Sequence, residues 1–174
     1  CPREVDIIGV MRAMRSLVVE SGGAPETLKA VLGYCHANGN PWSEPRQRRM
    51  AWTEGLEVPL YTPDKEYLLF VCCTSCYEQR SQKIARSLVE LLNRAGVSYG
   101  VLGPEQNCCG ESVRKIGDES LFQKLAGANV ELFNARGVKK IITTSPHCLQ
   151  NSVVTRIRSW MNGGSSKVSS SITS

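Results

Sequence analysis

The chain has 174 residues, of which 41% are hydrophobic and 21% charged, and its formal net charge is +5. A chain of this length and composition can bury one hydrophobic core of ordinary size, so we expect one domain with an appendage. No apolar run approaches the roughly 20 residues of a membrane span, which excludes a span in this sequence. The arginines of EPRQRRM (44–50) are not interleaved with aromatic residues, and no nucleic-acid-binding motif occurs. We therefore set nucleic acid aside and interpret this cluster as a solvated loop.

Helices are expected in the first 39 residues. Apolar side chains recur at helical spacing over residues 5–19, and Gly22 and Gly23 follow, so an amphipathic helix is predicted to end there. A second helix is predicted from Pro25, because proline suits the first turn of a helix, to Gly39.

The next segment, residues 40–64, contains four prolines. Proline interrupts both helices and strand ladders, so a long connector with little regular structure is predicted, apart from one turn of helix around RRMAW (48–52). This connector is interpreted as a domain boundary.

Short apolar runs then alternate with amphipathic segments. Strands are predicted at residues 67–73, 97–103 and 138–145, and helices at residues 81–96 and 119–137. This order predicts an α/β fold, in which helices pack on a parallel sheet. Ligands of such sheets lie at the carboxyl ends of the strands.

The eight cysteines carry the chemical information. They are Cys1, Cys35, Cys72, Cys73, Cys76, Cys108, Cys109 and Cys148. Four disulfides are a poor interpretation, because the sequence shows no secretion signal and adjacent cysteines rarely bridge each other. Cysteines instead follow each of the three predicted strands, so three strand ends are expected to bring thiolates to one edge of the sheet. We interpret these as ligands of a metal or cluster.

The spacing of these cysteines resembles a known family. Cys73 is followed by residues 74–107, by Cys108-Cys109-Gly110, by residues 111–144 and by the sequence SPHC (145–148). This pattern is similar to the cysteine-rich CCG domain that occurs in the B and D subunits of heterodisulfide reductases. The same domain occurs in the small subunit of anaerobic glycerol-3-phosphate dehydrogenase and in the iron-sulfur subunits of glycolate and lactate oxidases.

The resemblance extends to the N-terminal part of the chain. CPREVDIIGVMRAMR (1–15) looks like the exit from a bacterial-type ferredoxin motif, and GNPW (39–42) is seen in the same family. This implies that the sequence is a fragment that starts at the end of a ferredoxin-like domain, in which Cys1 would ligate a second [4Fe-4S] cluster. The implied organisation is a helical ferredoxin-like end at 1–39, a connector at 40–66, a CCG α/β domain at 67–154 and a low-complexity tail at 155–174, disordered or truncated.

The resemblance also implies a [4Fe-4S] cluster at the strand ends, non-cubane in the best-understood relatives. The family pattern assigns Cys73, Cys108, Cys109 and Cys148 as ligands, and Gly110 as the residue that leaves room for inorganic sulfide against the backbone. Soft thiolates suit iron, and two ligands on adjacent residues can serve a cluster but would crowd a single tetrahedral ion.

The sequence departs from the family at its closing Cys-x-x-Cys motif, where Ser145 takes the first position. A serine alkoxide can ligate iron, so Ser145 stays a candidate ligand, although it is a much poorer match than a thiolate at neutral pH. Cys72 and Cys76 stand where relatives usually have small residues. Either one of them compensates, giving a different cluster such as a cubane, or both are extra thiols. His147 is interpreted as a hydrogen-bonding or structural residue, and Cys35 as a core residue.

The function implied is that of an iron-sulfur electron-transfer subunit of a heterodisulfide-reductase-like oxidoreductase. Electrons would pass between ferredoxin-type clusters and the CCG cluster to a disulfide, a quinone or a flavoprotein. The expected partners are a membrane cytochrome or a flavoprotein subunit, and the expected location is cytoplasmic, at the inner face of the membrane through a partner or an upstream region. The alternatives are a zinc-binding structural module and a dithiol redox sensor that uses Cys72, Cys73 and Cys76.

Overall fold

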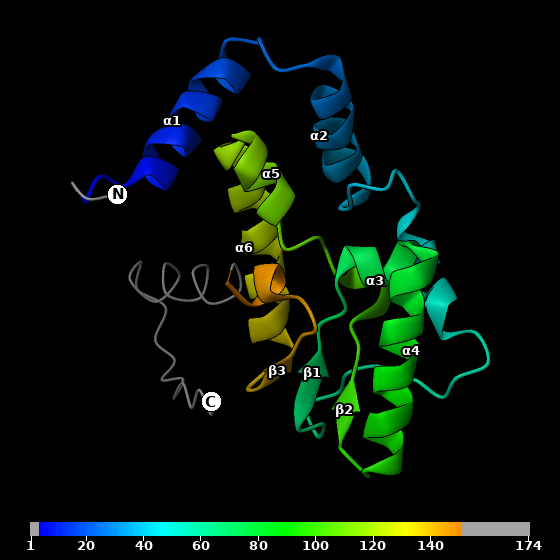
Figure 1. The fold of residues 1–174 in the computed structure, drawn as a ribbon. Helices are drawn as coiled ribbons and strands as arrows, with labels where there is room; N and C mark the ends of the chain where they lie inside the picture. Colours follow the sequence, from blue (N-terminus) through cyan, green and yellow to red (C-terminus); the bar gives the residue numbers. More distant parts are fainter. Residues whose placement is uncertain (1–3, 151–174) are drawn as a thin grey trace.

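The computed structural model describes residues 4–150 (Figure 1). Its centre is a three-stranded parallel sheet of β1 (Tyr67–Leu69), β2 (Tyr99–Gly100) and β3 (Ile141–Ile142), in the order β2-β1-β3. The parallel α/β fold expected from the alternating pattern is therefore confirmed. Predictions for Cys1, for residues 151–154 and for the tail at 155–174 lie outside the described residues.

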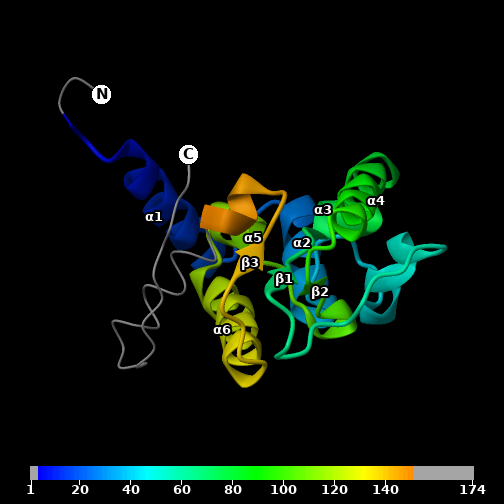
Figure 2. The ribbon, with the colours of Figure 1, turned by 90° about the horizontal axis from the view of Figure 1, so that it is seen from below.

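Helices cover both faces of the sheet. The two long ones are α4 (Gln79–Arg94) and α6 (Glu119–Ala135), which lie on opposite sides of the strands (Figures 1 and 2). Leu68 belongs to the core cluster that includes Phe133 of α6, whereas Leu69 belongs to the cluster that includes Val89 of α4. Successive residues of a strand point to opposite faces, so β1 is buried on both sides.

The strands are shorter than the apolar runs that predicted them, and two short helices were not predicted. Cys72 takes the cap position of α3 (Cys73–Tyr77), so the chain turns into a helix where a continuing strand was expected. The other is α5 (Glu111–Ile116), directly after Gly110. Five and six residues are too few to show a helical period, which explains why the pattern missed them.

The connector is more ordered than its prolines suggested. The predicted turn of helix is the 3₁₀ helix η1 (Arg46–Thr53). Farther on, Leu60 pairs in parallel with Val101 and extends the sheet beyond β2. A Cβ atom at Gly100 would lie 2.5 Å from the Cα of Tyr61, so the close approach of this segment requires glycine. A second short 3₁₀ helix, η2 (Gly103–Glu105), follows β2.

The two predicted N-terminal helices are present as α1 (Ile7–Glu20) and α2 (Glu26–Asn38), and α5 lies between them (Figures 1 and 2). Cys35 of α2 is fully buried in a cluster with Val113 of α5 and Phe122 of α6. The segment interpreted as the end of another domain thus packs directly on the α/β unit. Among the described residues, no helix is both long and apolar enough to cross a membrane.

Candidate metal centre

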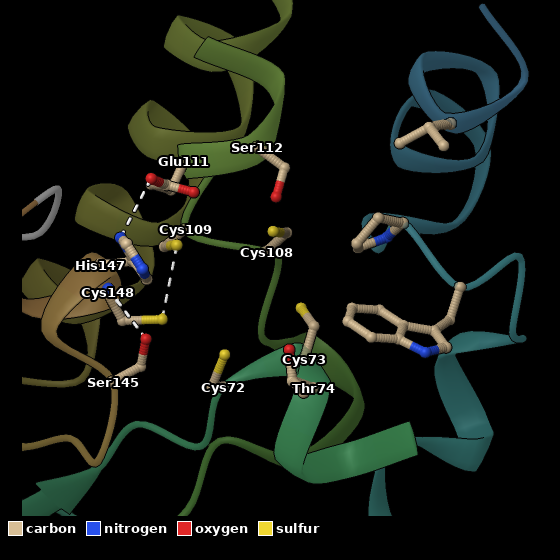
Figure 3. A pocket seen from close by; sticks show the side chains of 13 residues that line it. Cys72, Cys73, Thr74, Cys108, Cys109, Glu111, Ser112, Ser145, His147 and Cys148 are labelled. Carbon is tan, nitrogen blue, oxygen red and sulfur yellow. Dashed lines mark hydrogen bonds and ion pairs between the residues drawn. The ribbon is translucent and has the colours of Figure 1, made fainter. Parts of the chain in front are cut away.

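A pocket of about 280 Å³ lies beyond the carboxyl ends of the three strands, and five thiol groups line it (Figure 3). They belong to Cys72, Cys73, Cys108, Cys109 and Cys148. These residues come from the three segments that follow the strands, which is the arrangement that the parallel-sheet rule predicted. The structure brings together all four described cysteines that the family pattern assigned as ligands, and adds Cys72.

The vicinal pair is held by a buried asparagine of α6. Asn129 accepts a hydrogen bond from the backbone N–H of Asn107 at 3.0 Å and donates its amide to the carbonyls of Asn107 and Cys108, at 3.2 and 3.1 Å. The N–H of Cys108 donates to the carbonyl of Gly39 at 2.7 Å. The backbone beside the pair is therefore fixed by partners from two other elements, because buried peptide groups require such partners.

Gly110 has a steric role that sequence reasoning did not anticipate. Its φ of +80° lies in the left-handed region, and a Cβ atom would lie 2.7 Å from a ring carbon of Phe122. Gly110 is not among the residues that line the pocket, but its N–H donates to the sulfur of Cys108 at 3.5 Å. The space that the missing side chain leaves is next to Phe122, so clearance for inorganic sulfide is not the reason that the structure gives for glycine here.

Ser145 follows β3 and directly precedes a helical turn that contains Cys148. The hydroxyl of Ser145 accepts a hydrogen bond from the backbone N–H of Cys148 at 3.4 Å, as a helix-capping serine does. The thiol of Cys148 donates to the sulfur of Cys109 at 3.4 Å. His147 lies at the exposed rim of the pocket, where its ring pairs with Glu111 at 3.1 Å (Figure 3).

Comparison with known proteins identifies this unit. Residues 67–151 match a family model described as "CCG: Cysteine-rich domain". These residues form a CCG domain. They contain the five thiols of the pocket, among them the vicinal pair Cys108 and Cys109.

Curated relatives of the chain are named as iron-sulfur proteins or oxidoreductases. The EtfAB:quinone oxidoreductase of Syntrophomonas wolfei is 37% identical over 84% of this chain and 22% of its own length. The probable iron-sulfur-binding oxidoreductase FadF of Bacillus subtilis is 37% identical over 76% of this chain and 20% of its own length. The D subunit of the dihydromethanophenazine:CoB–CoM heterodisulfide reductase of Methanosarcina barkeri is 27% identical, over 86% and 37% respectively.

The chain thus spans about a fifth of the length of the first two relatives. No solved structure gives a significant match to it.

The thiols of the CCG domain are close enough to share protons. The pKa of Cys72 is lowered to about 6, mainly by side-chain hydrogen bonding with Cys148, although burial opposes the shift. Cys108 in the same way lowers the pKa of Cys73. The pKa values of their two partners shift in the opposite direction, because side-chain hydrogen bonding raises the pKa of Cys108 and of Cys148.

The protein alone cannot keep all five thiols ionised. Two thiolates at the 3.4 Å that separates the sulfurs of Cys109 and Cys148 would repel each other by about 5 kcal/mol at an effective dielectric constant of about 20. A cationic centre removes this repulsion, because thiolates are the form that binds metal. In residues 4–150, no group of three or more His, Cys, Asp or Glu side chains is arranged to hold a single metal ion. The donor set and the pocket volume fit an iron-sulfur cluster better than one zinc ion.

Two further cysteines lie outside the pocket. Cys76, a candidate ligand from the sequence, is buried in the core cluster of α4, and burial raises its pKa to about 12. The structure does not bring Cys76 among the pocket thiols, because α3 turns its side chain toward this core. Cys35 is likewise buried, as expected of a core residue, and its pKa rises to about 12, mainly through burial.

Sequence reasoning missed Arg49. The arginine cluster was interpreted as a solvated loop, which is right for Arg48 but wrong for Arg49, of which only 3% is exposed. Its guanidinium donates to the sulfur of Cys73 at 3.2 Å. A usable signal was present in the sequence, because Arg49 and the buried Trp52 are three residues apart and share one side of a helical turn.

Proposed function

We propose that this chain is an iron-sulfur electron-transfer part of an oxidoreductase, with its cluster in the pocket of the CCG domain. The observation that carries this proposal is the convergence on one pocket of five thiols from the three segments that follow the strands. The names of the relatives support the same chemistry. When bound, the cluster would supply one-electron redox chemistry.

We assign the ligands as Cys73, Cys108, Cys109 and Cys148, with Cys72 replacing the thiol that Ser145 lacks. Cys72 lines the same pocket as Cys148, the last ligand of the family motif, and side-chain hydrogen bonding with Cys148 lowers its pKa. The hydroxyl of Ser145 already accepts from the backbone of Cys148. Serine therefore caps the turn, while the neighbouring thiol provides the sulfur donor.

Other residues of the CCG domain and of the connector orient the thiols and limit the access of water to them. All the assigned ligands except Cys72 are buried, so water has little access to their sulfur atoms. Asn129 fixes the backbone of the vicinal pair, and Arg49 contacts Cys73. Pro41 and Trp42 of the connector also line the pocket and give it an apolar part.

The cluster type, the partners and the location extend this proposal. We propose a [4Fe-4S] cluster at the CCG site, a second one through Cys1, and electron exchange with a flavoprotein, a quinone or a membrane cytochrome. One relative is named as a quinone oxidoreductase, and quinones reside in membranes. This supports a place at the inner face of the membrane, reached through a partner or an upstream region.

Anaerobic reconstitution with iron and sulfide tests the proposal. We expect a brown protein with about four iron atoms and four sulfides per CCG site, and a low-temperature EPR signal in one of its redox states. A colourless protein that binds zinc instead would support the structural module. Reversible loss of thiols without iron would support the dithiol sensor. Either result would contradict the cluster.

The assignment of Cys72 as the ligand that substitutes for a cysteine at position 145 makes a separate prediction. Cys72→Ser is expected to lower iron retention by at least about tenfold, because it removes a sulfur donor, and the double variant Cys72→Ser with Ser145→Cys is expected to restore it. Iron and sulfide are measured after gel filtration. Cys76→Ser is the matched control, since this thiol lies outside the pocket. Full retention in Cys72→Ser, together with a gain in Ser145→Cys, would show that Cys72 is not a ligand.

A further inference from the structure

A buried arginine, Arg49, contacts one of the pocket thiols from outside the pocket. Arg49 is 3% exposed, and its guanidinium donates to the sulfur of Cys73 at 3.2 Å and to that of Cys76 at 3.7 Å. Its Cζ atom lies 5.7 Å from the centre of the Tyr77 ring. Arg49 is not one of the residues that line the pocket, so it touches the site through Cys73.

Within the described part of the chain, no carboxylate balances this charge. Seven ion pairs are formed among residues 4–150, and Arg49 takes part in none of them. A charged side chain is almost never fully buried without a partner, because the loss of hydration costs several kcal/mol. The groups that can offset it are the face of Tyr77 and the sulfurs of Cys73 and Cys76. Of these sulfurs, that of Cys73 is the nearer and lines the pocket.

The connector brings Arg49 to this position from a distant part of the sequence. Arg49 lies on η1, whose end is anchored to α4 by Arg86, which donates to the carbonyl of Trp52 at 2.7 Å. Trp52 itself is buried in the core beneath α4. The packing of Trp52 against α4 therefore fixes η1, and η1 in turn holds the guanidinium of Arg49 against the sulfur of Cys73.

We propose that Arg49 is a positioning residue that orients Cys73 through a hydrogen bond to its sulfur and raises the reduction potential of the cluster in the CCG domain. This inference rests on the proposed cluster. Reduction adds negative charge to the site, and a nearby cation that donates a hydrogen bond to a ligand sulfur stabilises the reduced state. Low solvent access strengthens the effect, because water does not screen it.

The guanidinium suits this role better than an ammonium group would. Arginine presents a planar fork of donors that can reach two sulfurs at once, and it stacks on an aromatic ring. Lysine would keep the charge but concentrate it at one point. Arg49→Lys is therefore expected to preserve part of the effect, and Arg49→Met to remove it.

The test compares Arg49→Met with Arg48→Met in the reconstituted protein. Both variants remove one positive charge from η1, but Arg48 is exposed and pairs with Glu44. Iron and sulfide are counted first, and the potential is then measured by EPR-monitored redox titration. At a fixed potential, the ratio of reduced to oxidised cluster is expected to fall about tenfold in Arg49→Met, to fall less in Arg49→Lys and to stay unchanged in Arg48→Met.

The possible outcomes separate the two proposals. If the wild-type protein binds no iron, the cluster itself is wrong. If all forms bind iron with one potential, or if the Arg48 and Arg49 variants shift equally, the role of Arg49 is wrong. Should Arg49→Met fail to fold, wild-type protein labelled with ¹⁵N in its arginine guanidinium groups provides a second measurement. Pulsed EPR must then show ¹⁵N coupled to the reduced cluster, and absence of that coupling would overturn the inference.

Discussion

Replacing Cys109 with alanine is expected to lower iron retention after anaerobic reconstitution by at least about tenfold. Cys109 lines the pocket, and its sulfur lies 3.4 Å from that of Cys148. Alanine offers no donor, and the surroundings are buried, so water is a poor substitute for the lost thiolate. Iron and acid-labile sulfide per chain, together with the visible absorption, measure the effect.

Cys35→Ala is the matched control for Cys109→Ala. Cys35 is as deeply buried, but it lies in the cluster between α2, α5 and α6 and does not line the pocket. Both substitutions remove one buried thiol, so each carries a similar packing cost of about 1 kcal/mol. Equal iron retention in the two variants would mean that the pocket does not hold the cluster, whatever else iron binds to.

The convergence of cysteines was predictable because it depends on topology. Parallel strands place their carboxyl ends at one edge, so Cys73, Cys108 and Cys148 meet in the structure although long segments separate them in sequence. The helices of the N-terminal part were also predictable, because long amphipathic segments with glycine ends give strong local signals. Strand order and local helix signals can both be predicted from the sequence without knowing which side chains pack together across the fold.

The polar contacts of the site could not be read from local patterns. Arg49 looked solvated because its sequence neighbours are charged, and its burial depends on Cys73, 24 residues later. Asn129 stands in the middle of a helix, where nothing in the periodicity distinguishes a buried asparagine from an exposed one. Gly110 was predicted to leave room for sulfide, but the contact that requires glycine there became visible only with Phe122 beside it.

The contacts of Asn129 also predict a large loss of stability. Asn129→Leu keeps the approximate size of the side chain but leaves three buried backbone groups without partners, namely the N–H and carbonyl of Asn107 and the carbonyl of Cys108. Each such group costs about 1–3 kcal/mol, so we expect a loss of about 3–9 kcal/mol in the free energy of unfolding. Small domains are stable by only about 5–15 kcal/mol, so this variant approaches the limit of folding.

Urea unfolding of the protein without iron measures this cost separately from cluster binding. Asn134→Leu is the matched control, because Asn134 lies on the same helix with an exposed side chain. Its substitution is expected to change stability by less than about 0.5 kcal/mol. If both leucine variants unfold at the wild-type urea concentration, Asn129 does not hold the vicinal pair. If Asn129→Leu alone is destabilised, the contacts of Asn129 stabilise the fold of the CCG domain. The same contacts hold the backbone of Asn107 and Cys108, so they also place Cys108 and Cys109 at the pocket.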